Sequence, residues 1–512
     1  MHNDFIIIKD GRETIEYKIV VDGLFMYKDN QSLRESVDGF ISDFHEAKHN
    51  FNECYGAYRI SIFFNEQALF FTDNSGMLRF FISDSKVYSS LAEAAKSKVD
   101  CVPNYNAIIQ FLTFGCVYTG ETIVRSVDMS NPNMFYSVVG DKIVETSKNL
   151  KKLYEYKLEN CSLEKIVSQA VSHTDGKIGC TITGGIDSRT VLANLINIGI
   201  MPELAISGNA DQIDVKIAQK IANCLGIKLN ITSDDIEEKD WFDDSAQAAD
   251  GQFGICGIYR ENKLAKFLDE AGIELQFGGL NGEMYKNSFI NQDFPWYEGK
   301  PNWSRFYKYK VGTFDYSRDY FGDKVQSELD NLQDTIVKWL SNHEGRNKAE
   351  AYLNAGYSIM QARGSLMINM YQRHITIYHP LMERKTASYA FGINPYSLEM
   401  QAFQRQEISV KCKDIKDIKT DRNLTCNYKR RAREFFASYL YLMKIGVQRI
   451  VFRAKEDVRI DKSFEKGLKS EAFFKAFDVT KKMGIICNEC LPEAVPPALA
   501  DRLFTIGTFF GT

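Results

Sequence analysis

A phosphate-binding turn is predicted over residues 183–188, which read Thr-Gly-Gly-Ile-Asp-Ser. The turn follows a β-prone run, 178–182, and precedes an apolar run, 190–196, with helical periodicity. A turn between a strand and the N-terminus of a helix presents backbone N–H groups and the positive end of the helix dipole to an anion. We therefore expect phosphate groups to bind at this turn.

The side chains of the turn suit that chemistry. Gly184 and Gly185 let an anion approach the backbone closely, and Thr183 and Ser188 add hydroxyl donors. A carboxylate beside bound phosphates normally shares a magnesium ion with them, so Asp187 predicts Mg²⁺. The spacing excludes a Walker A loop, which requires G-x-x-x-x-G-K-[ST]. The alternative is an ordinary glycine turn joining a buried strand to a helix.

The segments after this turn alternate between strands and helices. Strands are predicted over 204–208, 227–231 and 273–277, and helices over 162–171 and 215–225. This alternation predicts a parallel, doubly wound α/β sheet whose ligands bind at the carboxyl ends of the strands. Ser207 and Asp214 are therefore expected at the same edge as the turn 183–188. Asp214 and the nearby Asp211 suit N-terminal capping of the helix equally well.

The rest of the chain divides into a β-rich beginning and a helical end. Residues 1–148 contain short strand-like runs, two of which are predicted to pair as a hairpin across residues 65–67. The aromatic and charged stretch 290–345 is predicted to be an insertion or lid, and the chain is predicted to be helical from Ala349. We therefore expect two domains, 1–148 and 149–512.

Two short patterns suggest metal sites. Residues 45–49 match the H-E-x-x-H pattern of zinc proteases, within a helix predicted over 35–52. His45 and His49 lie among polar residues without a further ligand pattern, so two solvated histidines are expected. A zinc protease is the alternative, and it predicts stoichiometric zinc. Cys487 and Cys490 form a single C-x-x-C, which is too little for a structural zinc site.

Composition narrows the class of protein. The 512 residues are 44% apolar and 25% charged, and the formal net charge of −4 argues against nucleic acid as the main partner. Eleven scattered cysteines favour reduced thiols in a cytoplasmic protein. We expect neither a signal peptide nor a membrane span. The basic segment 427–444 is expected to pack on the domain; a membrane-surface helix is the alternative.

The turn 183–188 resembles the pyrophosphatase loop, S-G-G-x-D-S, of enzymes that cleave ATP between its α- and β-phosphates. It departs in Thr183 for the first Ser and in Arg189 after the last. The resemblance extends over nearly the whole chain to the asparagine synthetase family. It implies ATP on residues 183–188, with adenine and ribose near Ser207, and a PP-loop, HUP-like α/β domain with a helical C-terminal part.

Residues 278–283 are similar to the S-G-x-G-x-D-E pyrophosphate loop of that family. Gly278 and Glu283 match the pattern, whereas Gly279 and Gly282 stand where acidic residues are usual. The resemblance implies a nucleotide contact at Gly278 and a second magnesium ligand at Glu283. The number of ions is left open, because fewer carboxylates are present. A plain β-turn would account for the glycines alone.

Further segments resemble the substrate side of the family's site. Residues 380–383, Pro-Leu-Met-Glu, are similar to its P-F-L-D segment. Arg363 and Arg373 are candidates for gripping a substrate carboxylate or the phosphates, and surface salt bridges are equally expected. A lysine assists catalysis in this family, and Lys419 is assigned that role by position only.

The N-terminal strands resemble the family's glutaminase domain, an α+β Ntn-hydrolase-like β-sandwich. That glutaminase uses an N-terminal cysteine as nucleophile, whereas this chain begins Met1-His2 and its first cysteine is Cys54. A thiolate activated by its own α-amine cannot be built from these residues. The domain is therefore expected to keep the scaffold and to lack glutamine hydrolysis.

Together these features predict an AMP-forming carbon–nitrogen ligase. A small carboxylate substrate would be adenylated with ATP and Mg²⁺, with Asp187, Glu283 and Lys419 as catalytic residues. Ammonia or an amine would then form the amide, in surface-polysaccharide or secondary-metabolite synthesis. A homodimer is left open, and contact with a membrane surface is not expected. The alternative is a catalytically dead ATP-binding or scaffold homologue.

Overall fold

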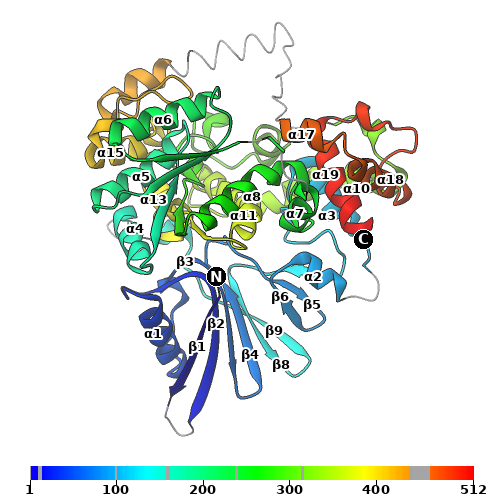
Figure 1. Cartoon of the computed structure of the whole chain (residues 1–512), viewed down its shortest axis with the longest axis horizontal. Helices are drawn as coiled ribbons and strands as arrows, with labels where there is room; N and C mark the ends of the chain where they lie inside the picture. The colour runs from blue at the N-terminus through cyan, green and yellow to red at the C-terminus, as the bar shows by residue number, and fades with distance from the viewer. Residues whose placement is uncertain are drawn as a thin grey trace.

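The computed structural model describes the whole chain except residues 1, 10–13, 98–100, 157–161, 234, 237–239, 313–315, 438–439, 441–461 and 512. An antiparallel six-stranded sheet forms the N-terminal part, at the bottom of Figure 1. Its order is β1-β2-β3-β4-β8-β9. The strands are β1 (His2–Lys9), β2 (Ile15–Tyr27), β3 (Cys54–Phe64), β4 (Gln67–Thr72), β8 (Met134–Val139) and β9 (Lys142–Ser147).

Local sequence explains this sheet. The predicted hairpin is confirmed between β3 and β4, where Asn65 and Glu66 have φ angles of 44° and 59°. Two consecutive positive φ values are typical of the two-residue turn that matches strand twist. Helix α1 (Leu33–His45), capped by Ser32, covers one face. Its Phe40 ring packs edge-on against Phe25 of β2, so an aromatic core joins the helix to the sheet.

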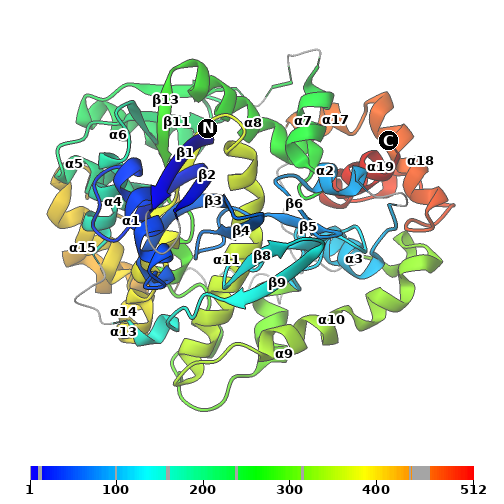
Figure 2. The same ribbon diagram turned by 90° about the horizontal axis from the view of Figure 1, so that it is seen from below.

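Smaller elements complete the region before residue 148. A three-stranded sheet has the order β6-β5-β7. Its elements are β5 (Phe81–Ser83), β6 (Lys86–Tyr88) and β7 (Asp128–Met129), with helices α2 (Leu91–Lys96) and α3 (Tyr105–Phe114) between them. Figure 2 shows α3 beside α10 and α19 of the later chain, so the N-terminal region also contributes to the helical part.

The predicted parallel sheet is confirmed. Its order is β12-β11-β10-β13-β14, and every neighbouring pair is parallel. The strands are β10 (Lys177–Thr181), β11 (Glu203–Ser207), β12 (Leu229–Thr232), β13 (Ile273–Phe277) and β14 (Thr376–Tyr378). The chain runs outward from β10 to β12 and then returns to β13 on the other side of β10. Such a reversal of strand order opens a crevice for ligands at the carboxyl ends of β10 and β13.

Helices pack around this sheet. Figure 1 shows α5 and α6 on one side of it, with α8 and α11 on the other. The helices nearest the sheet are α4 (Leu163–Ser172), α5 (Ile186–Asn197), α6 (Ile213–Leu225), α8 (Ile255–Glu270), α11 (Lys348–Tyr371) and α15 (Ala402–Lys411). Left-handed Gly226 ends α6 (φ 66°), and the side chains of α6 that face the sheet are buried.

The remaining helices form the helical part of the molecule. They are α7 (Trp241–Ala249), α9 (Trp303–Phe306), α10 (Gln326–Ser341), α12 (Arg384–Ala387), α13 (Tyr389–Gly392), α14 (Pro395–Glu399), α17 (Lys462–Gly467), α18 (Glu471–Lys482) and α19 (Pro497–Gly511). In the segment predicted as a basic helix, residues 431–437 are helical, while 438–439 and 441–444 lie outside the described residues. Among the described residues, no helix is both long and apolar enough to cross a membrane.

The prediction of continuous helix from Ala349 is wrong at β14. Its three residues, Thr376–Tyr378, are all buried and extend the parallel sheet by pairing with β13. A three-residue strand is too short to show a periodicity of its own, and its pairing partner lies about a hundred positions earlier. Tertiary pairing therefore decides the conformation there.

Candidate functional site

The turn 183–188 joins β10 to α5 at the crevice. The N-cap of α5 is Gly185, which has no side chain to bond the first N–H groups of the helix. Ser188 Oγ accepts from Thr183 N (3.1 Å), and Thr183 Oγ1 accepts from Gly185 N (3.3 Å). The two hydroxyls hold the turn in shape, while the helix end retains donors and a positive dipole for an anion.

Asp187 lies in the first turn of α5 with both carboxylate oxygens engaged. Lys286 Nζ is 2.5 Å from Asp187 Oδ2, and both side chains are largely buried. Gln404 Nε2 donates to Asp187 Oδ1. The lysine ammonium thus occupies the place beside the carboxylate where a metal cation would bind. This pairing was missed from the sequence, because Lys286 and Gln404 are far from residue 187 and belong to no recognised motif.

The second glycine-rich turn, 278–283, lies directly against the first. A Cβ on Gly279 would lie 2.5 Å from Ser188 N, and one on Gly282 would lie 2.0 Å from Asp187 Cγ. Real Cβ atoms do not approach this closely, so no acidic side chain fits at either position without moving the backbone. The two departures from the expected acidic pattern therefore have a steric cause in this fold.

Glu283 adds a second carboxyl group to the site. Burial raises its pKa, and the negative charge of Asp187 raises it further, while Lys286 and Arg422 oppose that shift. Across the part of the chain that the structure describes, no three His, Cys, Asp or Glu side chains are grouped to hold a metal. Two carboxylates nevertheless suffice for Mg²⁺ when phosphate oxygens and waters complete its coordination.

The other predicted site residues lie around the first turn. Asp214 Oδ1 accepts from Gly184 N (2.9 Å), whereas Asp211 is exposed. Ser207, at the end of β11, pairs through its hydroxyl with Thr232 Oγ1 (2.9 Å). The side chain of Lys419 is exposed, and its carbonyl oxygen contacts Arg189. Asp214 therefore touches the turn directly, and Ser207 lies on the neighbouring strand.

Arg189 anchors the turn from beneath. Its side chain is 0% exposed and donates to Ile418 O (2.6 Å), Gly184 O (3.0 Å) and Lys419 O (3.1 Å). Burial lowers the pKa of Arg189, and the nearby Cys426 and Asp421 partly offset that effect. The sequence shows Arg189 only as a departure from the S-G-G-x-D-S pattern; the structure shows that it fastens the turn to residues 418–419.

His379 supports the second turn. Burial lowers its pKa to about 4, so the ring is neutral at physiological pH. Leu280 N donates to His379 Nδ1 (3.2 Å), which places the ring proton on Nε2. A Cβ on Gly278 would lie 2.3 Å from His379 Cε1. Gly278 is therefore required for the ring to pack beneath the turn.

Glu383, from the Pro-Leu-Met-Glu segment, faces the N-terminal sheet. Its Oε1 accepts from Gly56 N (2.6 Å) and from the Tyr378 hydroxyl (3.1 Å), and Ser75 Oγ lies 3.5 Å from Oε2. Burial raises the pKa of the Glu383 carboxyl from 4.5 to about 8. The segment thus joins the six-stranded antiparallel sheet to the five-stranded parallel sheet.

This buried carboxyl predicts a pH dependence of stability. Between the unfolded pKa of 4.5 and the folded pKa of about 8, the folded protein holds one proton more at Glu383 than the unfolded protein does. The stability that this proton contributes is therefore lost as pH rises through that window. Glu383→Gln removes the titration. The free energy of unfolding of wild type relative to this variant should fall by up to about 1.4 kcal/mol per pH unit. Urea unfolding at pH 5 and pH 8 measures it, with exposed Glu270→Gln as control; a pH-independent difference would contradict it.

The zinc-protease alternative is corrected by the structure. Helix α1 ends at His45, and Ala47 has a positive φ of 55°, so His45 and His49 do not share a helix. The His49 ring instead packs on Phe44 and Phe51, and burial lowers its pKa. The zinc-protease arrangement is therefore absent from the described residues. Arg363 Nε donates to the Tyr118 hydroxyl (3.0 Å), so its guanidinium is engaged with a side chain of the N-terminal region.

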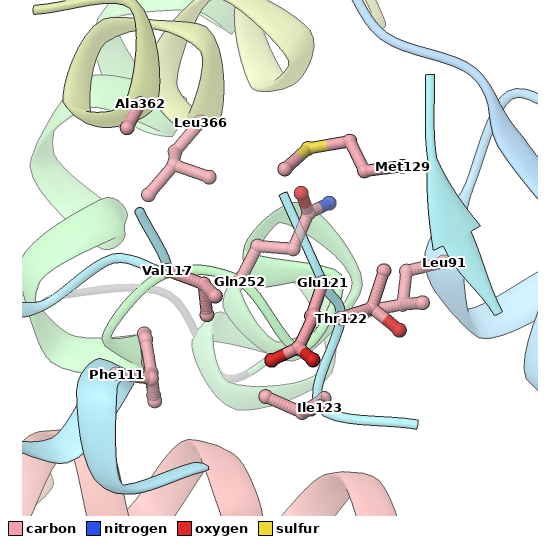
Figure 3. A pocket seen from close by; sticks show the side chains of 11 residues that line it. Leu91, Phe111, Val117, Glu121, Thr122, Ile123, Met129, Gln252, Ala362 and Leu366 are labelled. Carbon is pink, nitrogen blue, oxygen red and sulfur yellow. The ribbon is translucent and has the colours of Figure 1, made fainter. Parts of the chain in front are cut away.

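A small pocket, whose lining includes no residue of the two turns, is shown in Figure 3. It is mainly apolar and measures about 30 Å³, which is room for one or two waters. Glu121, one of its polar lining residues, accepts from Asn106 Nδ2 (2.6 Å). Neither its size nor its lining suits a substrate.

Comparison with known proteins adds no assignment. No protein-family model matches the chain, and no curated protein matches it. The geometry of the two glycine-rich turns is therefore the basis for a functional proposal.

Proposed function

We propose that the protein is an asparagine synthase-like, ATP-dependent carbon–nitrogen ligase that forms an amide through an acyl-adenylate. The observation that carries this proposal is the ion pair between Asp187 and Lys286 (2.5 Å). It lies at the N-terminus of α5, where no side chain caps the helix. A helix end, a carboxylate and a buried ammonium together provide anion-binding and cation-binding groups at one place. On this proposal the parallel sheet is a PP-loop, HUP-like ATP-pyrophosphatase domain and residues 1–148 are an Ntn-like glutaminase relic.

The residues present fit ATP and magnesium. The Asp187 carboxylate already binds one cation, the Lys286 ammonium, and Glu283 lies close enough for its pKa to respond to Asp187. Mg²⁺ bound by Asp187 and Glu283 would neutralise the phosphate charge. Lys286, released from Asp187, would then pair with a phosphate oxygen. The N–H groups at the start of α5 would hold the pyrophosphate.

The reaction is adenylation followed by aminolysis. A substrate carboxylate attacks the α-phosphorus of ATP, the bond to the bridging oxygen breaks, and pyrophosphate leaves. Ammonia or an amine then attacks the acyl-adenylate, giving the amide, AMP and a proton. The protein contributes mainly positioning and charge stabilisation. On this proposal the exposed Lys419 assists catalysis as an auxiliary group, and Ser207 contacts the nucleoside.

On this proposal free ammonia or an amine substrate supplies the nitrogen. A cytoplasmic site of action, where ATP is available, suits this chemistry.

Product analysis tests the proposal. The protein is incubated with ATP, Mg²⁺ and a panel of carboxylates and amines, and phosphorus NMR identifies the products. We expect AMP and pyrophosphate, in amounts that depend on the presence of both the carboxylate and the amine. Formation of ADP and phosphate instead would contradict it.

A non-catalytic ATP-binding or scaffold protein is the second candidate. Three observations favour it: Lys286 and Gln404 occupy both oxygens of Asp187, and Gly184 N, a possible phosphate donor, is bonded to Asp214. On this candidate the ion pair stays intact, so Asp187 does not become free to hold Mg²⁺ and ATP is not turned over.

Lys286→Met separates the two candidates. If Lys286 exchanges Asp187 for a phosphate, losing a charge-assisted hydrogen bond should lower kcat/KM for ATP by about 10- to 100-fold. Lys286→Arg, which keeps the charge, should retain more activity. Steady-state pyrophosphate release measures both. Tighter ATP binding by Lys286→Met, without turnover in either protein, would favour the scaffold.

A further inference from the structure

A surface hollow lies at residues 295–298, within the aromatic and charged stretch 290–345. It measures about 680 Å³, within the range of small-molecule sites, and is lined by Trp296, Tyr297, Glu298, Asn347, Asn394 and Tyr396. The lining comes from the 290–345 segment, the start of α11 and the start of α14. Three separate parts of the chain therefore build it.

Two aromatic rings face solvent in the hollow. Trp296 is 66% exposed and Tyr396 is 46% exposed, although large aromatic side chains normally bury most of their area. The backbone of Trp296 and the ring of Tyr396 are held in place: Lys348 Nζ donates to the Trp296 carbonyl oxygen (2.8 Å), and the Tyr396 hydroxyl donates to Pro295 O (2.9 Å). Exposed rings carried on a bonded framework offer an apolar platform to a ligand.

Polar groups at the hollow are arranged to donate. Asn347 Oδ1 accepts from Glu350 N (3.0 Å), and Asn394 Oδ1 accepts from Tyr396 N (2.9 Å). Each oxygen is used as a helix cap, which leaves the amide NH₂ groups to a ligand; in the described chain neither has a partner. Glu298 adds an exposed carboxylate acceptor. A sugar hydroxyl both donates and accepts, so neighbouring hydroxyls match an amide beside a carboxylate.

The hollow is connected to the site at Asp187. The Tyr297 hydroxyl donates to Glu399 Oε1 (2.5 Å), and Asn287 Nδ2 donates to Glu399 Oε2 (2.5 Å). Asn287 directly follows Lys286, the partner of Asp187. Two hydrogen bonds to the buried Glu399 carboxyl therefore link Tyr297, in the wall of the hollow, to Asn287, the neighbour of Lys286 in the proposed ATP site.

We propose that this hollow binds a pyranose sugar, which stacks its C–H face on Trp296 and directs its hydroxyls to Asn347, Asn394 and Glu298. The sugar is the carbohydrate part of one of the two substrates to be joined; this second statement rests on the proposed function, whereas the binding itself does not. A cationic ligand suits the hollow less well, because the free amide groups are donors.

Saturation-transfer NMR without ATP tests the binding, with methyl pyranosides of glucose, N-acetylglucosamine and glucuronic acid as probes. We expect transfer to at least one probe, and affinity reduced more than about tenfold in Trp296→Ala. Asn394→Asp keeps the capping oxygen but removes the amide donor, and should weaken binding about tenfold. Phe474→Ala, an exposed aromatic on α18, is the control and should bind as wild type.

Separate outcomes bear on the two statements. Absence of transfer to every pyranoside, transfer unchanged in Trp296→Ala, or transfer to tetramethylammonium alone would overturn the sugar site. Binding of a pyranoside whose carboxylate or amine derivative does not increase pyrophosphate release would overturn its role as a substrate. Absence of pyrophosphate with every acceptor, while pyranosides still bind, would contradict the proposed function and leave the sugar site standing.

Discussion

Asp187→Asn should lower ATP-dependent pyrophosphate release by about 10²- to 10³-fold, because it removes the carboxylate that would hold Mg²⁺ against the phosphates. The change keeps the size of the side chain and one carbonyl oxygen beside Lys286 and Gln404. It removes the negative charge and replaces one acceptor oxygen by an amide donor. Release of pyrophosphate from ATP, followed at saturating acceptor, measures the effect.

Asp211→Asn is the matched control. Asp211 lies near the start of α6 but is exposed, and the turn 183–188 is contacted by Asp214 instead. Its loss should leave turnover within about twofold of wild type, as expected for an exposed side chain away from the reacting groups. Equal turnover in wild type and Asp187→Asn would show that the turn does not hold the reacting phosphates.

The first turn could be predicted because all its parts adjoin in the sequence. A buried strand, glycines, a carboxylate and an apolar helix occupy residues 178–196, and each element has its own periodicity. The parallel sheet could be predicted for the same reason, because its strands and helices alternate along the chain. The antiparallel order of the N-terminal strands was accessible only where a short turn joined two of them, as at residues 65–66.

The partners of Asp187 could not be predicted in this way. Lys286 and Gln404 meet the carboxylate only after β13 has been placed beside β10 and α15 has packed on α5. Neither side chain has a distinctive neighbour pattern, since lysine and glutamine occur commonly on helix surfaces. The close contact of Gly282 with Asp187 likewise appears only in three dimensions. The sequence placed Asp187 at the start of a helix, as the structure has it, while packing determines which charged and polar groups surround it.

The contacts of Glu383 could not be predicted from its sequence motif either. Its segment was expected beside the substrate, but its carboxyl bonds to Gly56 N at the N-terminal sheet. The contact joins residues 327 positions apart, and no local pattern contains it. The exposure of Trp296 could not be predicted from the sequence, because an aromatic-rich stretch normally predicts a buried core.

Arg189→Met should lower the free energy of unfolding by about 2 to 3 kcal/mol. The substitution removes the donors that satisfy the partly buried carbonyls Ile418 O and Lys419 O, and a carbonyl left without a partner costs about 1 to 3 kcal/mol where it is shielded from water. Relief of burying a guanidinium charge offsets part of that loss, since Arg189 lies in a site that lowers its pKa. Gly184 O loses less, because it also accepts from Asp421 N (3.2 Å).

Urea unfolding of Arg189→Met measures this cost, with Arg422→Met as the control because Arg422 is exposed. Arg189→Lys should be nearly as destabilised as the methionine variant, since one ammonium cannot reach three carbonyl oxygens in the positions that the planar guanidinium spans. If the fastening also shapes the phosphate turn, both variants should weaken ATP binding at temperatures where they remain folded. Wild-type stability in Arg189→Met would show that residues 418–419 are held by other contacts and that the buried arginine is dispensable to the turn.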